Sequence, residues 1–403
     1  MCFDTMNLLQ SIEKQQGKQA MAHNNTVFAQ LIKLVPRHEF ESLQKQHHQG
    51  RQLRKMTRWS QFIALGFAQL SGRCSLRDIV CNVTAQRKKL YHLGAGRVTR
   101  SSLARVNEKQ PSALYEALFH KMLSRCQGLA PKHRFRFRNK LFSMDASTIE
   151  LCLSVFPWAN FKQGKGAVKI HVGLDHDGHI PAFMTITDGK VHEVNIGRTL
   201  KLPKDSIVVF DRGYTDYSWY YSLETKGIIF VTRLKRNVKF KVLARRKVSK
   251  KQGLSSDQTI RITGQKAKDC PIELRRIGYR DPETGQQYYF LTNNFKLAAS
   301  TIAKIYKVRW DIELFFKWIK QNLKIKTFIG TSKNAVMTQI WVAMCMYLLL
   351  AYIKFSSKLS LNFLQILRLL QLNLFERRDL LHLLKGDPPE PSDSPQQQRL
   401  QFA

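Results

Sequence analysis

Two apolar runs of this chain each end on a single aspartate, and a later segment carries a glutamate between cations. Asp145 follows the run 140–144, and Asp211 follows the run 207–210. Glu313 lies in a segment rich in Lys and Arg, in a chain with only 29 acidic residues against 66 basic ones. A buried charge without a partner is costly, so an acid at the end of a buried strand indicates a counter-ion or a metal.

Carboxylates that converge at strand ends provide the hard oxygen ligands that a pair of Mg²⁺ ions requires. In such sites one ion activates the attacking oxygen and the other stabilises the leaving oxygen. Asp145 and Asp211 are 66 residues apart, and Glu313 follows 102 residues later. Only a folded core could therefore bring the three together.

The segment around Glu313 is expected to form one continuous amphipathic helix. At about 100° per residue, Tyr306, Arg309, Glu313 and Lys320 fall within one arc of roughly 60°, and apolar residues fill the neighbouring arc. The helix would present one acid among two cations and a tyrosine. An ordinary amphipathic helix with an Arg–Glu pair at i,i+4 explains the same pattern, so both interpretations stay open.

The spacing Tyr306-x2-Arg309-x3-Glu313-x6-Lys320 resembles the Y-R-E-K signature of bacterial insertion-sequence transposases of the DDE type, in the large family numbered four. The resemblance covers about residues 138–350, and the helical N-terminus is similar to the DNA-binding region that such enzymes often carry. Further segments that match in order are Asp145-Ala146-Ser147-Thr148, Asp211-Arg212-Gly213-Tyr214, Phe230-Val231-Thr232-Arg233-Leu234-Lys235 and Leu291-Thr292-Asn293.

The resemblance implies a catalytic site in which Asp145, Asp211 and Glu313 are the metal ligands. The expected cofactor is Mg²⁺, with Mn²⁺ able to substitute. The resemblance also implies DNA contacts by residues of the matching motifs, namely Tyr306, Arg309, Lys320, Arg212, Arg233 and Lys235.

The function that the resemblance implies is cut-and-paste DNA transposition. The expected partners are the terminal inverted repeats of a transposon and target DNA, both double-stranded, bound by a homodimer in the bacterial cytoplasm at the nucleoid, away from any membrane. Two alternatives stay open: a metal-dependent nuclease of the same fold that no longer mobilises DNA, and an inactive DNA-binding derivative.

Composition agrees with a nucleic-acid partner. The net charge of +37 and the pI of about 10.2 are typical of nucleic-acid binders, although a basic ribosomal or membrane-surface protein could share them. With 43% hydrophobic residues the chain is not a disordered basic protein. The seven cysteines form no C-x-x-C pair, which fits a reducing compartment and indicates neither a zinc knuckle nor a disulfide framework.

The predicted fold class is α/β, and the resemblance implies a ribonuclease-H-like core that a β-rich insertion interrupts. Helical periodicity in the first third and short alternating runs later set the boundaries. The apolar segment 335–353 could span a membrane by length, but we expect a buried core helix. The predicted parts are a helical DNA-binding domain at 1–130, catalytic core at 131–225 and 300–385, a basic β insertion at 226–299, and a disordered tail at 386–403.

Some residues depart from the family pattern. Hairpin-forming relatives can stack a flipped base on a tryptophan of the insertion, but no tryptophan lies between Trp219 and Trp310 in this chain. Tyr288 or Tyr289 could substitute, although strand tyrosines are more often packing residues. The acid in Val191-His192-Glu193 replaces the more usual aspartate and has no assigned role. His171, His176 and His179 lie close together in the sequence, but without cysteines or a helix at that spacing a zinc site is disfavoured.

Overall fold

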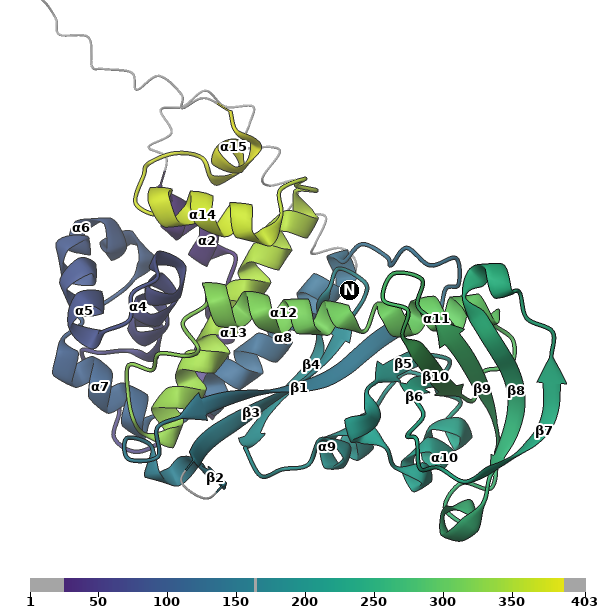
Figure 1. Cartoon of the computed structure of the whole chain (residues 1–403). Helices are drawn as coiled ribbons and strands as arrows, with labels where there is room; N and C mark the ends of the chain where they lie inside the picture. The colour runs from purple at the N-terminus through teal and green to yellow at the C-terminus, as the bar shows by residue number, and fades with distance from the viewer. Residues whose placement is uncertain (1–24, 163–164, 388–403) are drawn as a thin grey trace, which may run out of the picture.

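The computed structural model describes residues 25–162 and 165–387. Helices dominate the two ends of this range and strands its middle, so the molecule is a mixed α/β protein with a helical N-terminal part (Figure 1). The disordered tail expected at 386–403 lies outside the described residues from 388 onward. The first helices are α2 (Val27–Lys33), α3 (Arg37–Gln46), α4 (Arg58–Ser71), α5 (Leu76–Ala85), α6 (Arg87–Leu90), α7 (Arg100–Lys109) and α8 (Ala113–Leu129).

Side-chain caps begin several of these helices. Ser75 accepts a hydrogen bond from the Asp78 backbone N–H at 3.1 Å, as its capping-box spacing predicts. In α7, Ser101 lies inside the first turn. Thr99 is the cap, because its hydroxyl accepts from the Ser102 N–H while Ser102 Oγ receives the Thr99 N–H.

One ten-stranded mixed sheet forms the middle of the molecule, in the order β2-β3-β1-β5-β6-β10-β9-β8-β7, with β4 paired to β3. β3 and β4 form an antiparallel hairpin, and β3 also pairs with β1. The strands are β1 (Leu141–Leu151), β2 (Asn160–Lys162), β3 (Lys165–Asp175), β4 (Ile180–Asp188), β5 (Ile207–Phe210), β6 (Ile229–Arg233), β7 (Phe240–Arg246), β8 (Leu254–Ile262), β9 (Glu273–Arg280) and β10 (Gln287–Thr292).

The short strand β5 is apolar throughout because both of its faces are covered. Val208 and Phe210 pack into the core beneath α10 (Tyr217–Thr225), whereas Ile207 and Val209 pack against α11 (Ala299–Lys307). A strand buried on two sides cannot alternate apolar with polar residues. The helix α9 (Glu193–Thr199) lies between β4 and β5 in the chain.

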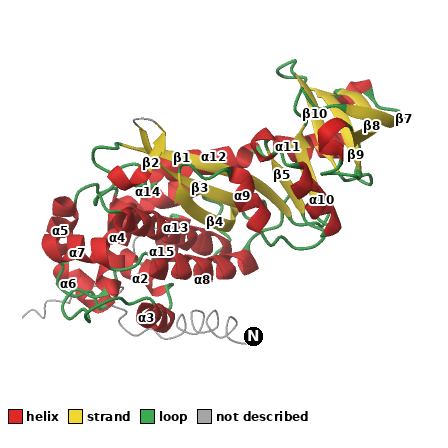
Figure 2. Cartoon of the chain, turned by 90° about the horizontal axis from the view of Figure 1, so that it is seen from below, coloured by secondary structure: helices red, strands yellow, loops and turns green. Residues whose placement is uncertain are grey.

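The β-rich insertion is not a separate sheet. Its last strand, β10, returns to pair antiparallel with β6, and β9, β8 and β7 then continue the same sheet outward. Figure 2 shows these strands at one end of the molecule and the N-terminal helices at the other.

Two expectations about the elements were wrong. Asp145 does not end its strand: β1 continues to Leu151 because its second half pairs with β3. The segment 306–320 is not one helix either. The helix breaks at Val308–Arg309 between α11 and α12 (Trp310–Asn322), where i→i+3 hydrogen bonds such as Ile312 N–H to Arg309 C=O replace the regular ladder.

The C-terminal helices are α13 (Lys333–Ser356), α14 (Phe363–Asn373) and α15 (Leu380–Lys385). Among the described residues, α13 alone is long and apolar enough for a membrane span, yet 94% of its most apolar window is buried inside the fold, as expected of a core helix. It packs between α8 and α4 and shares one hydrophobic core with the N-terminal helices. Gly66 permits this close approach, since a Cβ there would lie 3.1 Å from Met346 Sδ.

Candidate active site

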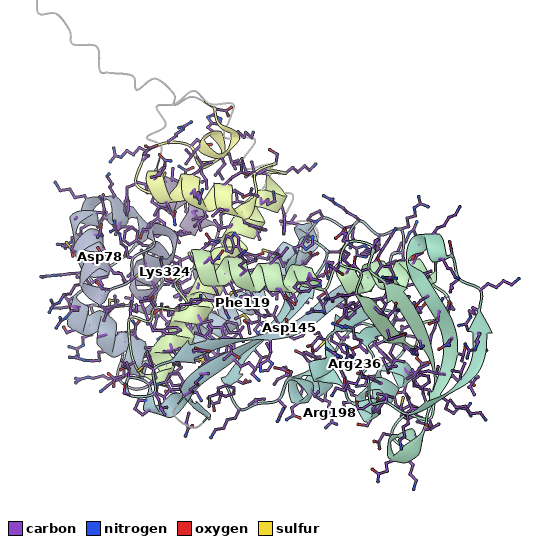
Figure 3. The ribbon with its side chains drawn as sticks, in the orientation of Figure 1. Asp78, Phe119, Asp145, Arg198, Arg236 and Lys324 are labelled. Carbon is purple, nitrogen blue, oxygen red and sulfur yellow. The ribbon has the colours of Figure 1, made fainter. Side chains whose placement is uncertain are left out.

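Strand register places the two aspartates side by side. β1 and β5 run parallel, and Met144 is the Cα partner of Phe210 in the last pair of their ladder. Asp145 and Asp211 are therefore the next residues on adjacent parallel strands, just where the two strands stop pairing. Asp145 lies at the middle of the molecule, on the part of β1 that α12 crosses (Figure 3).

Local hydrogen bonds orient one oxygen of each aspartate. Asp145 Oδ1 accepts from the Ala146 N–H at 2.8 Å, and Asp211 Oδ1 accepts from the Gly213 N–H at 2.8 Å. Gly213 allows the chain to turn tightly here, because a Cβ would lie 2.9 Å from Asp211 Oδ1 and 3.1 Å from Glu193 Oε2. In both aspartates the backbone N–H binds Oδ1, so Oδ2 takes no part in these local hydrogen bonds.

Arg309 links Glu313 to the aspartates. Its Nη2 donates to Glu313 Oε1 at 2.8 Å, and its Nη1 lies 3.8 Å from Asp145 Oδ2. The arginine stands in the break between α11 and α12, only 8% exposed. The i,i+4 pair that an ordinary amphipathic helix would contain is thus present, but it is also part of a contact with the first aspartate.

The charges of the three acids act on one another. Burial raises the pKa of Asp145 to about 6, the Ala146 N–H and Arg309 oppose that rise, and the negative charges of Asp211 and Glu313 add to it. Burial likewise raises the pKa of Tyr214, and Asp145, Asp211 and Glu193 contribute. Carboxylates that repel each other in a partly buried site are characteristic of functional centres.

This donor set fits divalent metal ions that prefer oxygen. Asp145 and Asp211 lie side by side with one oxygen of each fixed by a backbone N–H, and Arg309 links Asp145 to Glu313. Magnesium is bound in proteins by one or two such carboxylates while it keeps several open positions. Arg309 here supplies the positive charge that a metal would bring.

The other residues expected to contact DNA occupy different surroundings. Tyr306 is buried, and its ring lies 5.7 Å from the Arg309 guanidinium. Burial raises the pKa of Tyr306, and the positive charges of Arg309 and Arg233 oppose this rise. Arg233 ends β6 with its guanidinium 4.6 Å over the ring of Tyr288, and Arg212 is exposed directly after Asp211. Arg212 thus adjoins Asp211, and the charges of Arg233 and Asp211 both act on Tyr306.

Lys320 is not among them. Its Nζ donates to the Thr148 carbonyl at 2.8 Å, further along β1 from Asp145, and burial lowers its pKa. It lies two turns along α12 from Glu313, so it flanks the carboxylates along the helix instead of sharing one cluster with them.

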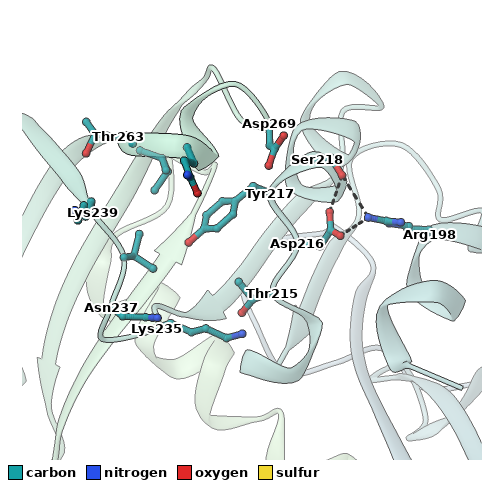
Figure 4. A pocket seen from close by; sticks show the side chains of 14 residues that line it. Arg198, Thr215, Asp216, Tyr217, Ser218, Lys235, Asn237, Lys239, Thr263 and Asp269 are labelled. Carbon is teal, nitrogen blue, oxygen red and sulfur yellow. Dashed lines mark hydrogen bonds and ion pairs between the residues drawn. The ribbon is translucent and has the colours of Figure 1, made fainter. Parts of the chain in front are cut away.

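Lys235 lines a separate cavity of about 890 Å³ between α10 and the insertion. Figure 4 shows it opposite Tyr217, with the ion pair of Arg198 and Asp216 at the rim. The structure therefore does not bring Lys235 to the aspartates, although it exposes the side chain on the insertion side of the fold.

Sequence reasoning missed the place of Glu193. It lies in the first turn of α9, with Oε1 3.3 Å from Lys169 Nζ and Oε2 close to Gly213. A fourth carboxylate thus borders the site, tied to β3 by a lysine. The signal available in the sequence was the Val-His-Glu turn ahead of β5, which by itself does not reveal where the acid points.

Two family descriptions match the chain. "Transposase DDE domain" matches residues 136–349, and a domain of unknown function (DUF4372) matches residues 23–96. The first contains all three carboxylates. The second covers the helices from α2 to α6.

Curated relatives carry the same kind of name. A Sinorhizobium fredii protein named as transposase y4zB is 33% identical over 72% of this chain and 81% of its own length. A Geobacillus stearothermophilus protein named as a transposase for insertion sequence element IS5377 is 28% identical over 76% of this chain and 84% of its own. Among solved structures, the piggyBac transposase synaptic complex with hairpin DNA aligns at 10% identity with a TM-score of 0.44, covering 92% of this chain and 80% of that one.

Proposed function

Because this chain belongs to the DDE transposases, metal-dependent enzymes that cut and join DNA in the transposition of insertion sequences, we propose that Asp145, Asp211 and Glu313 are its catalytic metal ligands. The observation that carries the assignment is the adjacency of the two aspartates in the β1–β5 register, with Arg309 linking Asp145 to Glu313. The sheet supports a ribonuclease-H-like core: parallel β1, β5 and β6, continued by an antiparallel hairpin and covered by helices on both faces.

Divalent ions at such carboxylates activate the attacking oxygen and stabilise the leaving oxygen of a phosphodiester. The chain's own part is to position those ligands. Backbone N–H groups hold one oxygen of each aspartate, α12 brings Glu313 across β1, and the buried Arg309 keeps the acids close despite their repulsion. The oxygen-only donor set favours Mg²⁺, with Mn²⁺ as a substitute.

The DNA contacts follow from charge around the site. Arg212, Arg233 and Arg309 border the carboxylates, where guanidinium groups can grip phosphates in a bidentate manner. Lys320 and Lys235 would extend that contact along α12 and toward the insertion. The substrates that we propose are terminal inverted repeats and target DNA, bound by a homodimer at the bacterial nucleoid.

The test is cleavage of DNA that carries the element's own ends. Asp145→Asn, Asp211→Asn and Glu313→Gln should each abolish strand cleavage in Mg²⁺ while end binding is kept, because each removes one hard ligand and no phosphate contact. Glu283→Gln is the matched control, since this exposed acid pairs with Lys307 on the surface. Normal cleavage by one of the three variants would remove that residue from the site.

The DNA products of this reaction distinguish a transposase from a nuclease and from an inactive DNA-binding protein. Nicks followed by joined strands indicate transposition, nicks alone a nuclease, and binding alone an inactive derivative.

Mg²⁺ or Mn²⁺ should support turnover, whereas Ca²⁺ should allow binding with little cleavage because its looser coordination misplaces the reacting oxygens. Full activity in a chelator would contradict the metal assignment.

A further inference from the structure

A second group of metal-type ligands lies at the first turn of α12. His176 and His179, from the turn between β3 and β4, meet Asp311 in the first turn of α12, and one ligand atom from each lies within 4.8 Å of the others. Asp311 precedes Glu313 by two residues, which is about 200° around a helix. Asp311 therefore projects from a different side of α12 than Glu313 does.

The distances between these ligand atoms are close to those between the ligands of a bound zinc ion. His176 Nδ1 lies 3.5 Å from Asp311 Oδ2, and His179 Nδ1 lies 3.6 Å from the same oxygen. Ligands about 2.0–2.1 Å from a tetrahedral zinc are roughly 3.3 Å from one another. A small inward shift of these side chains would thus complete a three-ligand site with a fourth position open to solvent.

The far nitrogen of His176 is engaged in a way that suits a ligand. Its Nε2 is 2.7 Å from Ser143 Oγ, inside the fold, where both residues are buried. When Nε2 carries the proton and donates to the serine, Nδ1 presents its lone pair to the carboxylate. Such a hydrogen bond on the second ring nitrogen is the usual way in which proteins orient a metal-binding histidine.

The turn that carries the histidines is held rigidly. Lys140 Nζ contacts Asp175 Oδ2 at 2.9 Å and Asp177 Oδ2 at 2.7 Å, and Tyr347 on α13 donates to the His179 carbonyl at 3.1 Å. His179 itself has φ of +54°, a left-handed conformation that histidine, like asparagine and aspartate, adopts more readily than most residues.

We propose that His176, His179 and Asp311 bind one Zn²⁺ ion, or a similar divalent transition metal, that ties the β3–β4 turn to the start of α12. Two imidazoles and one carboxylate select zinc over magnesium, whereas the oxygen-only catalytic group has the opposite preference. The site is structural: by fixing the first turn of α12, it fixes the helix that carries Glu313. Its existence does not depend on the proposed catalytic roles.

Zinc titration of the full-length protein tests the site. After dialysis against a chelator, calorimetry in millimolar Mg²⁺, which occupies the oxygen-only group, should show one Zn²⁺ per chain, and Zn²⁺ should raise Tm. His179→Asn keeps a residue that tolerates the left-handed backbone, and Asp311→Asn keeps the shape of the helix. Both should weaken zinc binding by at least about tenfold and lose the Tm increase.

Two matched variants control the result. His38→Ala removes a histidine that is 85% exposed and lies outside the group, so it should bind zinc as the wild type does. Asp145→Asn should also leave the zinc stoichiometry unchanged, since it alters only the catalytic group. The proposal would be overturned if the wild type bound no zinc, or if His179→Asn and Asp311→Asn bound zinc as tightly as the wild type. The group would then be only a histidine–aspartate ion pair.

Discussion

Arg309 is the residue on which the site depends most. It is buried, its two terminal nitrogens face Asp145 and Glu313, and its Nε has no hydrogen-bond partner within the described chain. A buried donor without a partner is costly. Arg309 Nε therefore keeps the capacity for one more hydrogen bond, next to the carboxylates that its terminal nitrogens contact.

Replacing Arg309 should weaken DNA binding in a salt-dependent manner. We expect Arg309→Ala and Lys320→Ala each to bind terminal-repeat DNA less tightly and to reduce the slope of log K against log[salt] by about one phosphate contact. Glu313→Gln should leave the slope unchanged, because it removes no cation. Fluorescence anisotropy over a range of salt concentrations measures this. An unchanged slope together with a lower Tm would instead show that the cations only stabilise the fold.

His171 gives the fold a dependence on pH. The residue is buried on β3, and burial, with help from Lys169, lowers the pKa of its imidazole from 6.5 to about 4. Its only hydrogen bond in the described chain joins Nε2 to Thr187 Oγ1 at 2.9 Å, while Nδ1 has no partner. The folded protein thus holds this histidine neutral.

Acid should therefore destabilise the protein through His171. Its folded pKa is below the unfolded value, so the unfolded chain takes up the proton first and stability is lost as pH falls from about 6.5 toward about 4. Between about pH 7.5 and about pH 5 the loss should approach about 2 kcal/mol. Urea unfolding at the two pH values, compared with His171→Gln, measures it. An equal loss in the variant would assign the effect to other groups.

At the scale of elements, one buried acid holds the insertion together. Asp257 on β8 accepts two hydrogen bonds from Arg275 on β9, at 2.9 and 2.7 Å, and a third from Arg246 on β7 at 3.2 Å. Asp257 and Arg275 are both about 5% exposed in their side chains. In so basic a part of the chain, this carboxylate is the counter-charge that three strands share.

Removing that acid should unfold the insertion more readily. Asp257→Ala leaves the guanidinium of Arg275 buried and unpaired, which costs about 3–5 kcal/mol. Glu273→Ala is the control on the neighbouring strand, because its pair with Arg261 is exposed and should contribute about 1 kcal/mol or less. Exchange of the backbone amide hydrogens in β7, β8 and β9 measures the local loss of stability. Equal effects of the two substitutions would contradict this account.

At the scale of the whole molecule, the N-terminal helices do not have a core of their own. Phe62 on α4 and Leu118 on α8 belong to the same hydrophobic cluster as Leu350 on α13, more than 200 residues later in the chain. Gln69 Oε1 also receives the Lys324 N–H at 2.7 Å. The N-terminal helical region is thus joined to the rest of the fold by α13.

A fragment of residues 25–130 should consequently fail to fold by itself. Without α13 it would expose the apolar faces of α4 and α8, and its burial would fall short of the chain entropy lost on ordering. We expect no cooperative thermal transition by circular dichroism and strong binding of a hydrophobic dye. A cooperative transition in the isolated fragment would show that these helices form an autonomous domain.

The sequence predicted most of the sheet and the identity of the adjacent acids. The strand 207–210 was evident because four consecutive apolar residues precede a tight Asp-Arg-Gly-Tyr turn. The break at Arg309 was not predictable from composition, since neither it nor Val308 is glycine or proline. Nor could sequence pair Asp311 with His176, because only tertiary packing joins positions so far apart.

The return of β10 beside β6 has a consequence for how such enzymes diversify. The chain leaves the central strands at the end of β6 and re-enters on its direct neighbour, so both junctions of the intervening stretch lie next to each other. A short loop could close that gap and leave β10 as an ordinary edge strand. Evolution could thus lengthen, shorten or exchange the stretch between Leu234 and Gln286 as a cassette, while the neighbouring aspartates on β1 and β5 keep their register.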